Sequence, residues 1–245
     1  MIIVYTCIVG SYDTLIKQPK FKDVKYVCFS DSIKPGNYKN WEVRQLNLSL
    51  ANEPNLLNRF YKILPHKFFP QNDYSLYIDG NIKLKINPNR LLDSFIKSKK
   101  KIAVFKHPNR QSLKSELEAC IILGKLKGQQ INEAESFLQS IKEEGFSSKE
   151  DLVAGYILLR KHNESKLNNA MKDWFSIVNN KIPRDQLSLV YVLWKNNIDL
   201  AYLDDWIEPE KFFYRLQHGH FIPYIPLYIQ NFFKKVHTKL RYFKN

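Results

Sequence analysis

Two oxygen-bearing side chains, Asp79 and Asn81, stand on either side of a glycine in this chain. The segment 74–79, which ends at Asp79, is rich in Tyr, Leu and Ile and predicts a strand that is buried on both faces. Gly80 allows the backbone to turn where this strand ends. Carboxylate and amide oxygens at this spacing can reach one hard divalent cation, which commonly also binds substrate phosphates. Because the same tripeptide is a common turn, the rest of the chain has to decide between a site and a turn.

Strands and helices alternate through the first half of the chain. Strands are predicted at 2–9, 26–29, 41–46, 74–79 and 102–105, and helices at 54–64 and 88–98. This alternation predicts an α/β fold with a mostly parallel sheet and helices on its faces. In the second half we expect helices within 111–144, 163–179 and 187–194, an apolar segment at 155–159 and a late strand at 199–203.

Several of the predicted strands end in polar residues. Residues 10–13 follow the first strand, 30–32 follow the second, and 79–81 follow the strand at 74–79. Ligands of open α/β sheets bind beyond the carboxyl ends of the strands. The sequence therefore predicts a ligand site at this edge of the sheet.

The charge balance narrows the class of partner. The chain has 245 residues with 38 Lys and Arg against 24 Asp and Glu, a net charge of +14, which favours nucleotide phosphates, nucleic acid or an acidic membrane surface. An apolar fraction of 44% is enough for a packed core. The three cysteines are scattered and form no disulfide or zinc pattern, so we expect a reducing compartment. The apolar N-terminus lacks a basic leader, and no run is long enough to cross a bilayer.

The C-terminal residues differ in composition from the rest. After Glu210 there is no acidic residue, and apolar residues recur at helical spacing from Ile229, with Lys and Arg between them. A basic helix with an aromatic apolar face suits an anionic membrane surface, although a helix docked on the protein's own core would show the same spacing. We therefore predict a domain at 1–210 and a basic amphipathic helical tail at 211–245.

Four clusters in a fixed order carry a family resemblance. They lie at 5–13, 26–31, 59–81 and 183–189. Together they resemble a family of GT-A-type glycosyltransferase domains found in bacterial surface-polysaccharide enzymes and in plant cell-wall and mucilage proteins. The resemblance implies a Rossmann-related GT-A fold, a nucleotide-sugar donor with a UDP-sugar favoured, and Mn²⁺ or Mg²⁺ as cofactor. It also implies transfer of the sugar to a glycan or lipid-linked acceptor in surface polysaccharide (capsule) synthesis.

The resemblance also implies the metal ligands. Asp79 is the first ligand, Asn81 the second, and His218 the third, with His220 as the alternative to His218. The family usually has an acidic residue where this chain has Asn81. Because Asn is a neutral ligand, we expect the dependence on metal to be less strict here.

Donor-binding residues follow from the same comparison. Backbone groups of Val9 and Gly10 are expected at the base, with Tyr12 stacking on it, and Asp31 at the base or ribose. Arg59 and Lys62 are three residues apart, so they project from one side of a helix toward the donor phosphates, near Asp79 and Gly80. Turn capping is the alternative role for Asp31, and a solvated basic face is the alternative for the two basic residues.

Asp185 is the candidate catalytic residue. If the enzyme inverts the anomeric centre, a carboxylate must take the proton of the acceptor hydroxyl; in a retaining enzyme Asp185 would position the donor sugar. An acidic residue in a first helical turn is also favoured by the helix dipole alone. On the acceptor and sugar side we expect His107, Arg110, Arg184 and Gln186, with the two arginines able to contact an acidic sugar or phosphate.

These expectations describe a cytoplasmic enzyme, peripheral on the inner face of the membrane. One alternative is a basic nucleic-acid-binding protein, but no nucleic-acid-binding motif is present, and we expect no nucleic acid partner. Another is a nucleotidyltransferase or sugar-phosphate hydrolase on a similar scaffold, which fold analogy does not exclude. The donor sugar, the acceptor, the stereochemistry and the oligomeric state stay open.

Overall fold

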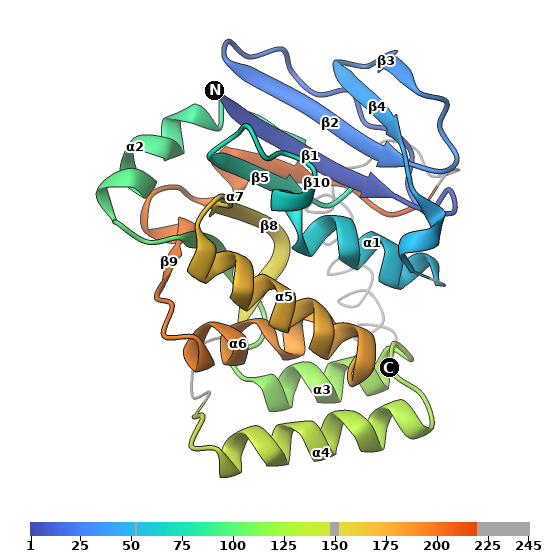
Figure 1. The fold of residues 1–245 in the computed structure, drawn as a ribbon, viewed down its shortest axis with the longest axis vertical. Coiled ribbons are helices and arrows are strands. Elements are labelled where there is room, and N and C mark those ends of the chain that lie inside the picture. Colours follow the sequence, from blue (N-terminus) through green and yellow to red (C-terminus); the bar gives the residue numbers. More distant parts are fainter. Residues whose placement is uncertain (52, 148–151, 220–245) are drawn as a thin grey trace, which may run out of the picture.

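The computed structural model describes residues 1–51, 53–147 and 152–219. An eight-stranded sheet forms its centre (Figure 1). Across the sheet the strands are β3 (Gly36–Tyr38), β4 (Trp41–Gln45), β2 (Val24–Ser30), β1 (Ile2–Ile8), β5 (Tyr74–Ile78), β8 (Val153–Lys161), β7 (Ile102–Lys106) and β9 (Leu200–Tyr202). Strands β4, β2, β1 and β5 are parallel, β8 runs antiparallel between β5 and β7, and β9 is parallel to β7. The expected α/β sheet is confirmed, with mixed strand directions.

Strand β1 shows why this sheet has two cores. Every residue of its sequence is buried. Successive side chains of a strand point to opposite faces, so Ile3, Tyr5 and Cys7 join one core, whereas Ile2 and Val4 join the other. A strand covered on both faces needs apolar residues at every position, which explains the continuous apolar run at the N-terminus.

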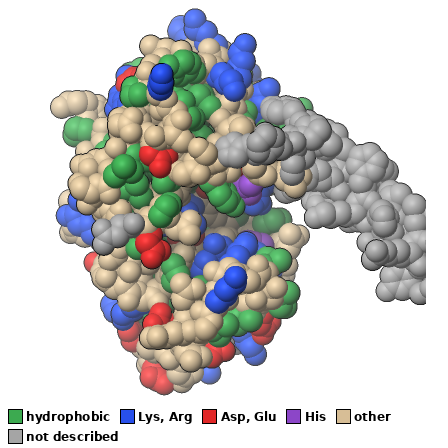
Figure 2. Space-filling view, turned by 90° about the vertical axis from the view of Figure 1, so that its right-hand side faces the viewer, with side chains coloured by type: hydrophobic (Ala, Val, Ile, Leu, Met, Phe, Trp, Pro, Cys, Tyr) green, Lys and Arg blue, Asp and Glu red, His purple; other side chains and the backbone are tan. Residues whose placement is uncertain are grey.

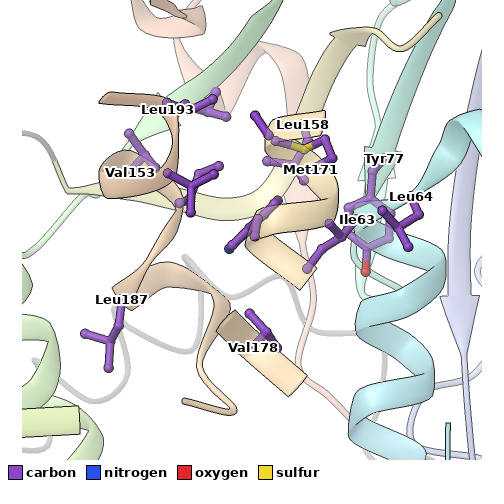
Figure 3. Close-up of a cluster of buried hydrophobic side chains, with 14 of the residues drawn as sticks. Ile63, Leu64, Tyr77, Val153, Leu158, Met171, Val178, Leu187 and Leu193 are labelled. Atoms are coloured by element: carbon purple, nitrogen blue, oxygen red, sulfur yellow. The ribbon is translucent and has the colours of Figure 1, made fainter. Parts of the chain in front are cut away.

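Helices cover the first face. They are α1 (Pro54–Ile63), α3 (Leu113–Ile122), α4 (Gln129–Glu143), α5 (Ser165–Asn180) and α6 (Leu189–Lys195). Figure 3 shows the core between them and the sheet, with Ile63 of α1, Tyr77 of β5, Leu158 of β8, Met171 of α5 and Leu193 of α6. This packing fixes α1 against the strands whose carboxyl ends form the predicted site.

The second face carries less structure. It holds α2 (Asn89–Lys97), α7 (Pro209–Phe212) and a two-stranded antiparallel sheet of β6 (Ile82–Leu84) and β10 (Phe213–Arg215). Phe212 and Phe213 pack against Phe105 of β7. The described fold thus continues past residue 210, where we expected the domain to end. The tail residues 220–245, including His220 and the expected amphipathic helix, lie outside the described residues.

The described residues also form four short 3₁₀ helices: η1 (Leu48–Leu50), η2 (Pro65–Lys67), η3 (Asp185–Leu187) and η4 (Leu203–Asp205). None of the described helices combines the length and the apolar character needed to cross a membrane. The longer expected helices and strands are confirmed to within a few residues. The three-residue strands β3, β6 and β10 and the short helix α7 were not expected from the sequence.

Candidate functional site

The carboxyl ends of β1 and β2 are tied together. The backbone N–H of Gly10 donates to the Asp31 carboxylate, at 2.9 Å from Oδ1 and 3.1 Å from Oδ2. Gly10 and Ser11 both have positive φ, 60° and 56°, so the chain turns sharply here. Asp31 therefore braces the loop after β1, and this loop presents Tyr12 with 65% of its surface exposed. Val9, just before the turn, is buried.

Asp79 stands at the carboxyl end of β5, as expected. Its backbone N–H donates to the carbonyl of Tyr156 in β8 at 2.9 Å, which holds the turn in place. Its Oδ1 accepts a hydrogen bond from Tyr77 at 3.0 Å and lies 3.9 Å from Lys62 Nζ. The carboxylate is thus directed at a cation supplied by α1, and about a quarter of the side chain (27%) is exposed.

Asn81 holds the segment that carries His218. The Leu216 N–H donates to the Asn81 carbonyl at 2.8 Å, and Asn81 Nδ2 donates to the Leu216 carbonyl at 2.7 Å. The same amide nitrogen lies 3.2 Å from His218 Nε2. The buried Asn81 Oδ1 has no hydrogen-bond partner, so the amide oxygen keeps its full acceptor capacity.

His218 is paired with a buried carboxylate. Its Nδ1 lies 2.9 Å and 3.1 Å from the two oxygens of Asp13, which is 9% exposed. A carboxylate at this nitrogen holds the proton on Nδ1 and leaves the lone pair of Nε2 facing Asn81. Gly80 permits this approach, because a Cβ there would stand 2.8 Å from Asp13 Oδ2. The Tyr12 ring lies beside the imidazole, with the ring centroids 5.1 Å apart.

Asp185 lies in a buried charge cluster. Its Oδ2 is 2.6 Å from Lys62 Nζ, and its Oδ1 is 3.2 Å from Arg59 Nε. Burial alone would raise the pKa of Asp185, but Arg59 and Lys62 outweigh it and hold this pKa well below its usual range. A carboxylate held in this way is a weak proton acceptor. The surroundings therefore favour the positioning role that we considered for Asp185 over the role of catalytic base.

Arg59 and Lys62 do face the same region, as their spacing predicts. Lys62 is 3% exposed, so it does not belong to a solvated basic face. Gly155 of β8 leaves room for it, because a Cβ at this position would lie 3.3 Å from Lys62 Nζ and 3.4 Å from Asp185 Oδ2. The expected contact of both basic residues with donor phosphates stays a prediction.

The residues expected on the acceptor side form a second group. Arg110 Nε donates to the Glu116 carboxylate at 2.6 Å, and Arg110 Nη2 lies 2.9 Å from His107 Nε2. Arg184 Nη2 approaches the other oxygen of Glu116 at 3.9 Å. Gln186 is turned toward β8, where its amide donates to the Val153 carbonyl at 3.2 Å.

The structure thus joins residues from distant parts of the chain at one sheet edge. It brings Asp13, Tyr77 and Gly155 to the residues expected in the site. Of Glu116 and Glu118, either of which we expected behind His107 and Arg110, it places Glu116 against Arg110. The polar end of the first predicted strand already pointed to Asp13, whereas Gly155 gave no signal inside its apolar segment. Over the ranges that the structure describes, no three His, Cys, Asp or Glu side chains gather closely enough to hold a metal ion by themselves.

The sheet, the helices and the polar strand ends define a GT-A-type glycosyltransferase-like fold, and sequence comparison gives the family. The model of the TOD1/MUCI70 glycosyltransferase-like domain matches residues 1–203, and the chain belongs to this family. The probable hexosyltransferase MUCI70 of Arabidopsis thaliana is 31% identical over 137 residues, which are 52% of this chain and 23% of that protein. The match to the family model ends at residue 203 and therefore does not include His218.

A solved structure supports the fold. The apo structure of the WbbM bifunctional glycosyltransferase superposes with a TM-score of 0.52 at 12% sequence identity, over 82% of this chain and 38% of that one. This chain therefore spans well under half the length of both similar proteins.

Proposed function

We propose that this chain transfers a sugar from a nucleotide-diphosphate donor to a glycan or lipid-linked acceptor. The observation that carries the proposal is the position of Lys62, whose Nζ lies between Asp185 at 2.6 Å and Asp79 at 3.9 Å beyond the end of β5. A nucleotide diphosphate leaves as an anion, and fixed cations in a partly buried site stabilise the charge that develops. Membership of a glycosyltransferase-like family supports the same reaction.

The loop after β1 is suited to the nucleoside. Tyr12 offers an exposed ring for stacking, and the turn at Gly10 and Ser11 exposes backbone groups beside it. Asp31 holds this loop through the Gly10 N–H, so its contribution to base or ribose binding is to fix the loop. A UDP-sugar is the donor that we favour.

Asp79, Asn81 and His218 would hold a divalent cation, Mn²⁺ or Mg²⁺. Two observations fit such an ion: the buried Asn81 Oδ1 has no partner, and Asp13 fixes the His218 ring with Nε2 as its unprotonated nitrogen. This nitrogen accepts the Asn81 amide N–H at 3.2 Å, and a bound ion would take the place of that hydrogen bond. Asp79 Oδ2 has no hydrogen-bond partner among the described residues. When bound, the cation would neutralise charge on the leaving diphosphate. With a single carboxylate among these three ligands, we expect moderate affinity, so nucleotide binding should be strengthened by metal but retained in part without it.

Asp185 would act by position. It contacts both Lys62 and Arg59 and keeps these two cations fixed. This role suits a carboxylate with a depressed pKa, and it requires no proton transfer.

We also propose that the reaction belongs to surface polysaccharide synthesis at the cytoplasmic face of a membrane. The support is the composition of 211–245, where basic residues alternate with apolar and aromatic ones. Truncation after residue 225 should release the protein from anionic liposomes and leave its thermal unfolding unchanged. Binding that persists after truncation would contradict the membrane role of the tail.

A panel of nucleotide sugars tests the reaction. Full-length protein is incubated with UDP-, GDP- and CDP-sugars, with and without Mn²⁺, and released nucleotide is measured. We expect slow hydrolysis of one donor class, and loss of that activity in the variant Lys62→Met/Asp185→Asn, which removes both charges together. Arg90→Gln, on the exposed surface of α2, is the matched control. If no nucleotide sugar is bound or hydrolysed, the proposal is wrong.

A further inference from the structure

The group formed by His107, Arg110, Glu116 and Arg184 has more hydrogen-bond donors than acceptors. His107 follows β7, Glu116 lies in α3, and Arg184 directly precedes η3. Glu116 is 1% exposed and, among the described residues, is the one carboxylate that forms an ion pair with either arginine. Two guanidinium groups thus share a single carboxylate within ion-pair distance, and Asp185, which also attracts Arg184, is already paired with Lys62 and Arg59.

The hydrogen bonds of His107 fix its tautomer. Its Nδ1 accepts the backbone N–H groups of Asn109, at 3.2 Å, and Arg110, at 3.0 Å. The ring proton must then sit on Nε2. Burial and the charge of Arg110 lower the pKa of His107 to about 4, so the ring stays neutral near pH 7. Nε2–H therefore faces the N–H groups of Arg110 Nη2 across 2.9 Å, donor against donor.

Arg184 is also short of acceptors. Its side chain is 16% exposed, and its buried Nε has no hydrogen-bond partner. The distance of 3.9 Å from Arg184 Nη2 to Glu116 Oε1 is too long for a hydrogen bond. Buried polar groups are nearly always paired, so this guanidinium nitrogen is available to an acceptor that a ligand supplies.

The surroundings add further positive charge. Burial and the neighbouring Arg184 lower the pKa of Lys125, as expected where cations crowd together. Figure 2 shows one face of the molecule hollowed near its middle, with Lys and Arg side chains gathered on one wall and His side chains at the edge. Planar guanidinium groups bind carboxylate and phosphate through paired hydrogen bonds.

Arg184 also connects this group to the proposed donor site. The next residue, Asp185, contacts Lys62 and Arg59, the two cations assigned to the donor phosphates. Arg184 is thus the direct neighbour in sequence of the residue that holds these cations. We propose that His107, Arg110 and Arg184 bind an oxyanion, a carboxylate or a phosphate, on the saccharide that receives the sugar. The assignment of this oxyanion to a saccharide rests on the proposed function. The acceptor is then an acidic or phosphorylated glycan.

Calorimetric titration of the full-length protein tests this site. The probes are a trisaccharide of uronic acid, its neutral methyl ester, a phosphorylated hexose and UDP. We expect the wild type to bind at least one anionic saccharide about tenfold or more tightly than the ester, with the carboxylate and phosphate probes identifying the source of the oxyanion. Arg184→Gln should lower the affinity for that anionic saccharide about 10- to 100-fold, as expected for a lost hydrogen bond between charged groups. The affinities for the ester and for UDP should change less than twofold.

Arg184→Gln is preferred over a change at Arg110, because Arg110 is the close partner of buried Glu116 and its loss can unfold α3. Arg90→Gln controls for net charge and should match the wild type. Three outcomes would overturn the inference: equal affinity for the acid and the ester, no saccharide binding, or a preference for the acid that survives Arg184→Gln. Weakened UDP binding in Arg184→Gln would also overturn it, because the arginine would then serve the donor. If anionic saccharides bind through Arg184 but no nucleotide binds, the proposed transferase function fails and the anion site stands.

Discussion

Lys62 Nζ lies 2.6 Å from Asp185 Oδ2, although 123 residues separate the two in the chain. Both side chains are nearly buried, with 4% and 3% of their surfaces exposed. The contact joins α1 to η3 across the carboxyl end of the sheet. Buried charges remain stable only when paired, and removal of one partner leaves the other uncompensated.

Asp185→Asn should therefore destabilise the protein by about 3 kcal/mol or more, measured by chemical denaturation. The double variant Lys62→Met/Asp185→Asn should lose less than the sum of the two single variants, since no lone charge stays buried. The more exposed pair of Lys100 and Asp199, at the similar distance of 2.7 Å, is the control, and Asp199→Asn should cost less than about 1 kcal/mol. Equal effects at the two pairs would contradict the assigned role of Asp185.

Asp13 should matter through His218. A carboxylate on the far nitrogen of an imidazole orients the ring for metal, and its loss typically lowers metal affinity about 10- to 100-fold. Asp13→Asn should thus weaken Mn²⁺ binding by this factor, as measured by electron paramagnetic resonance of free Mn²⁺, without a matching loss of metal-free nucleotide binding. Asp93→Asn, an exposed change on α2, should leave the titration unchanged. Unaltered Mn²⁺ affinity in Asp13→Asn would remove His218 from the metal site.

Gly155 should limit the size of the residue beside the charge cluster. A Cβ at this position would lie 3.3 Å from Lys62 Nζ, so Gly155→Ala displaces the ammonium slightly and Gly155→Val displaces it further. We expect the KM for the donor to rise about tenfold in Gly155→Val and less in Gly155→Ala. A tenfold rise corresponds to a loss of about 1.4 kcal/mol in binding free energy. A valine variant with wild-type donor KM and normal stability would show that Lys62 does not contact the donor.

His162 should make the protein sensitive to acid. Its Nε2 donates to the Phe69 carbonyl at 3.0 Å, and its buried Nδ1 has no partner. Burial lowers the pKa of His162 to about 4, below the value of about 6.5 for an unfolded chain. The unfolded state then binds more protons between these values, so the stabilisation is complete above pH 6.5 and falls as the pH drops toward 4.

This loss amounts to about 3 kcal/mol at most for His162. Denaturation at pH 7 and pH 4.5 measures it, and His162→Gln should show a smaller difference between the two pH values. His66 and His107 have pKa values lowered in the same direction, so part of the pH dependence will survive. An unchanged pH dependence in His162→Gln would contradict a buried neutral His162.

The sequence was sufficient for the elements with strong patterns. The apolar run of β1 and the strand before Asp79 predict buried strands of a mostly parallel sheet, and the structure pairs these two strands in parallel. Arg59 and Lys62 at a spacing of three predict a shared direction, and both reach Asp185. In each case the pattern is local: a run of apolar residues within one strand, or two residues about one turn apart on one helix.

The rest depends on contacts between distant residues. Strands of three residues such as β6 and β10 are too short to show a period, and their pairing brings Asn81 to Leu216. Asp13 and His218 are 205 residues apart, and no local pattern links them. The antiparallel direction of β8 was likewise not evident, because a strand buried on both faces has the same composition in either direction.

The central claim is that Asp79 stands at a metal-assisted diphosphate site, and a calorimetric titration of UDP tests it most directly. The wild type is titrated with and without Mn²⁺, beside Asp79→Asn, which keeps the size and a hydrogen-bond acceptor for Tyr77. We predict that Mn²⁺ tightens UDP binding about tenfold or more in the wild type and has no effect in Asp79→Asn. Equal enhancement by Mn²⁺ in both proteins, or no UDP binding by the wild type under either condition, would contradict the account.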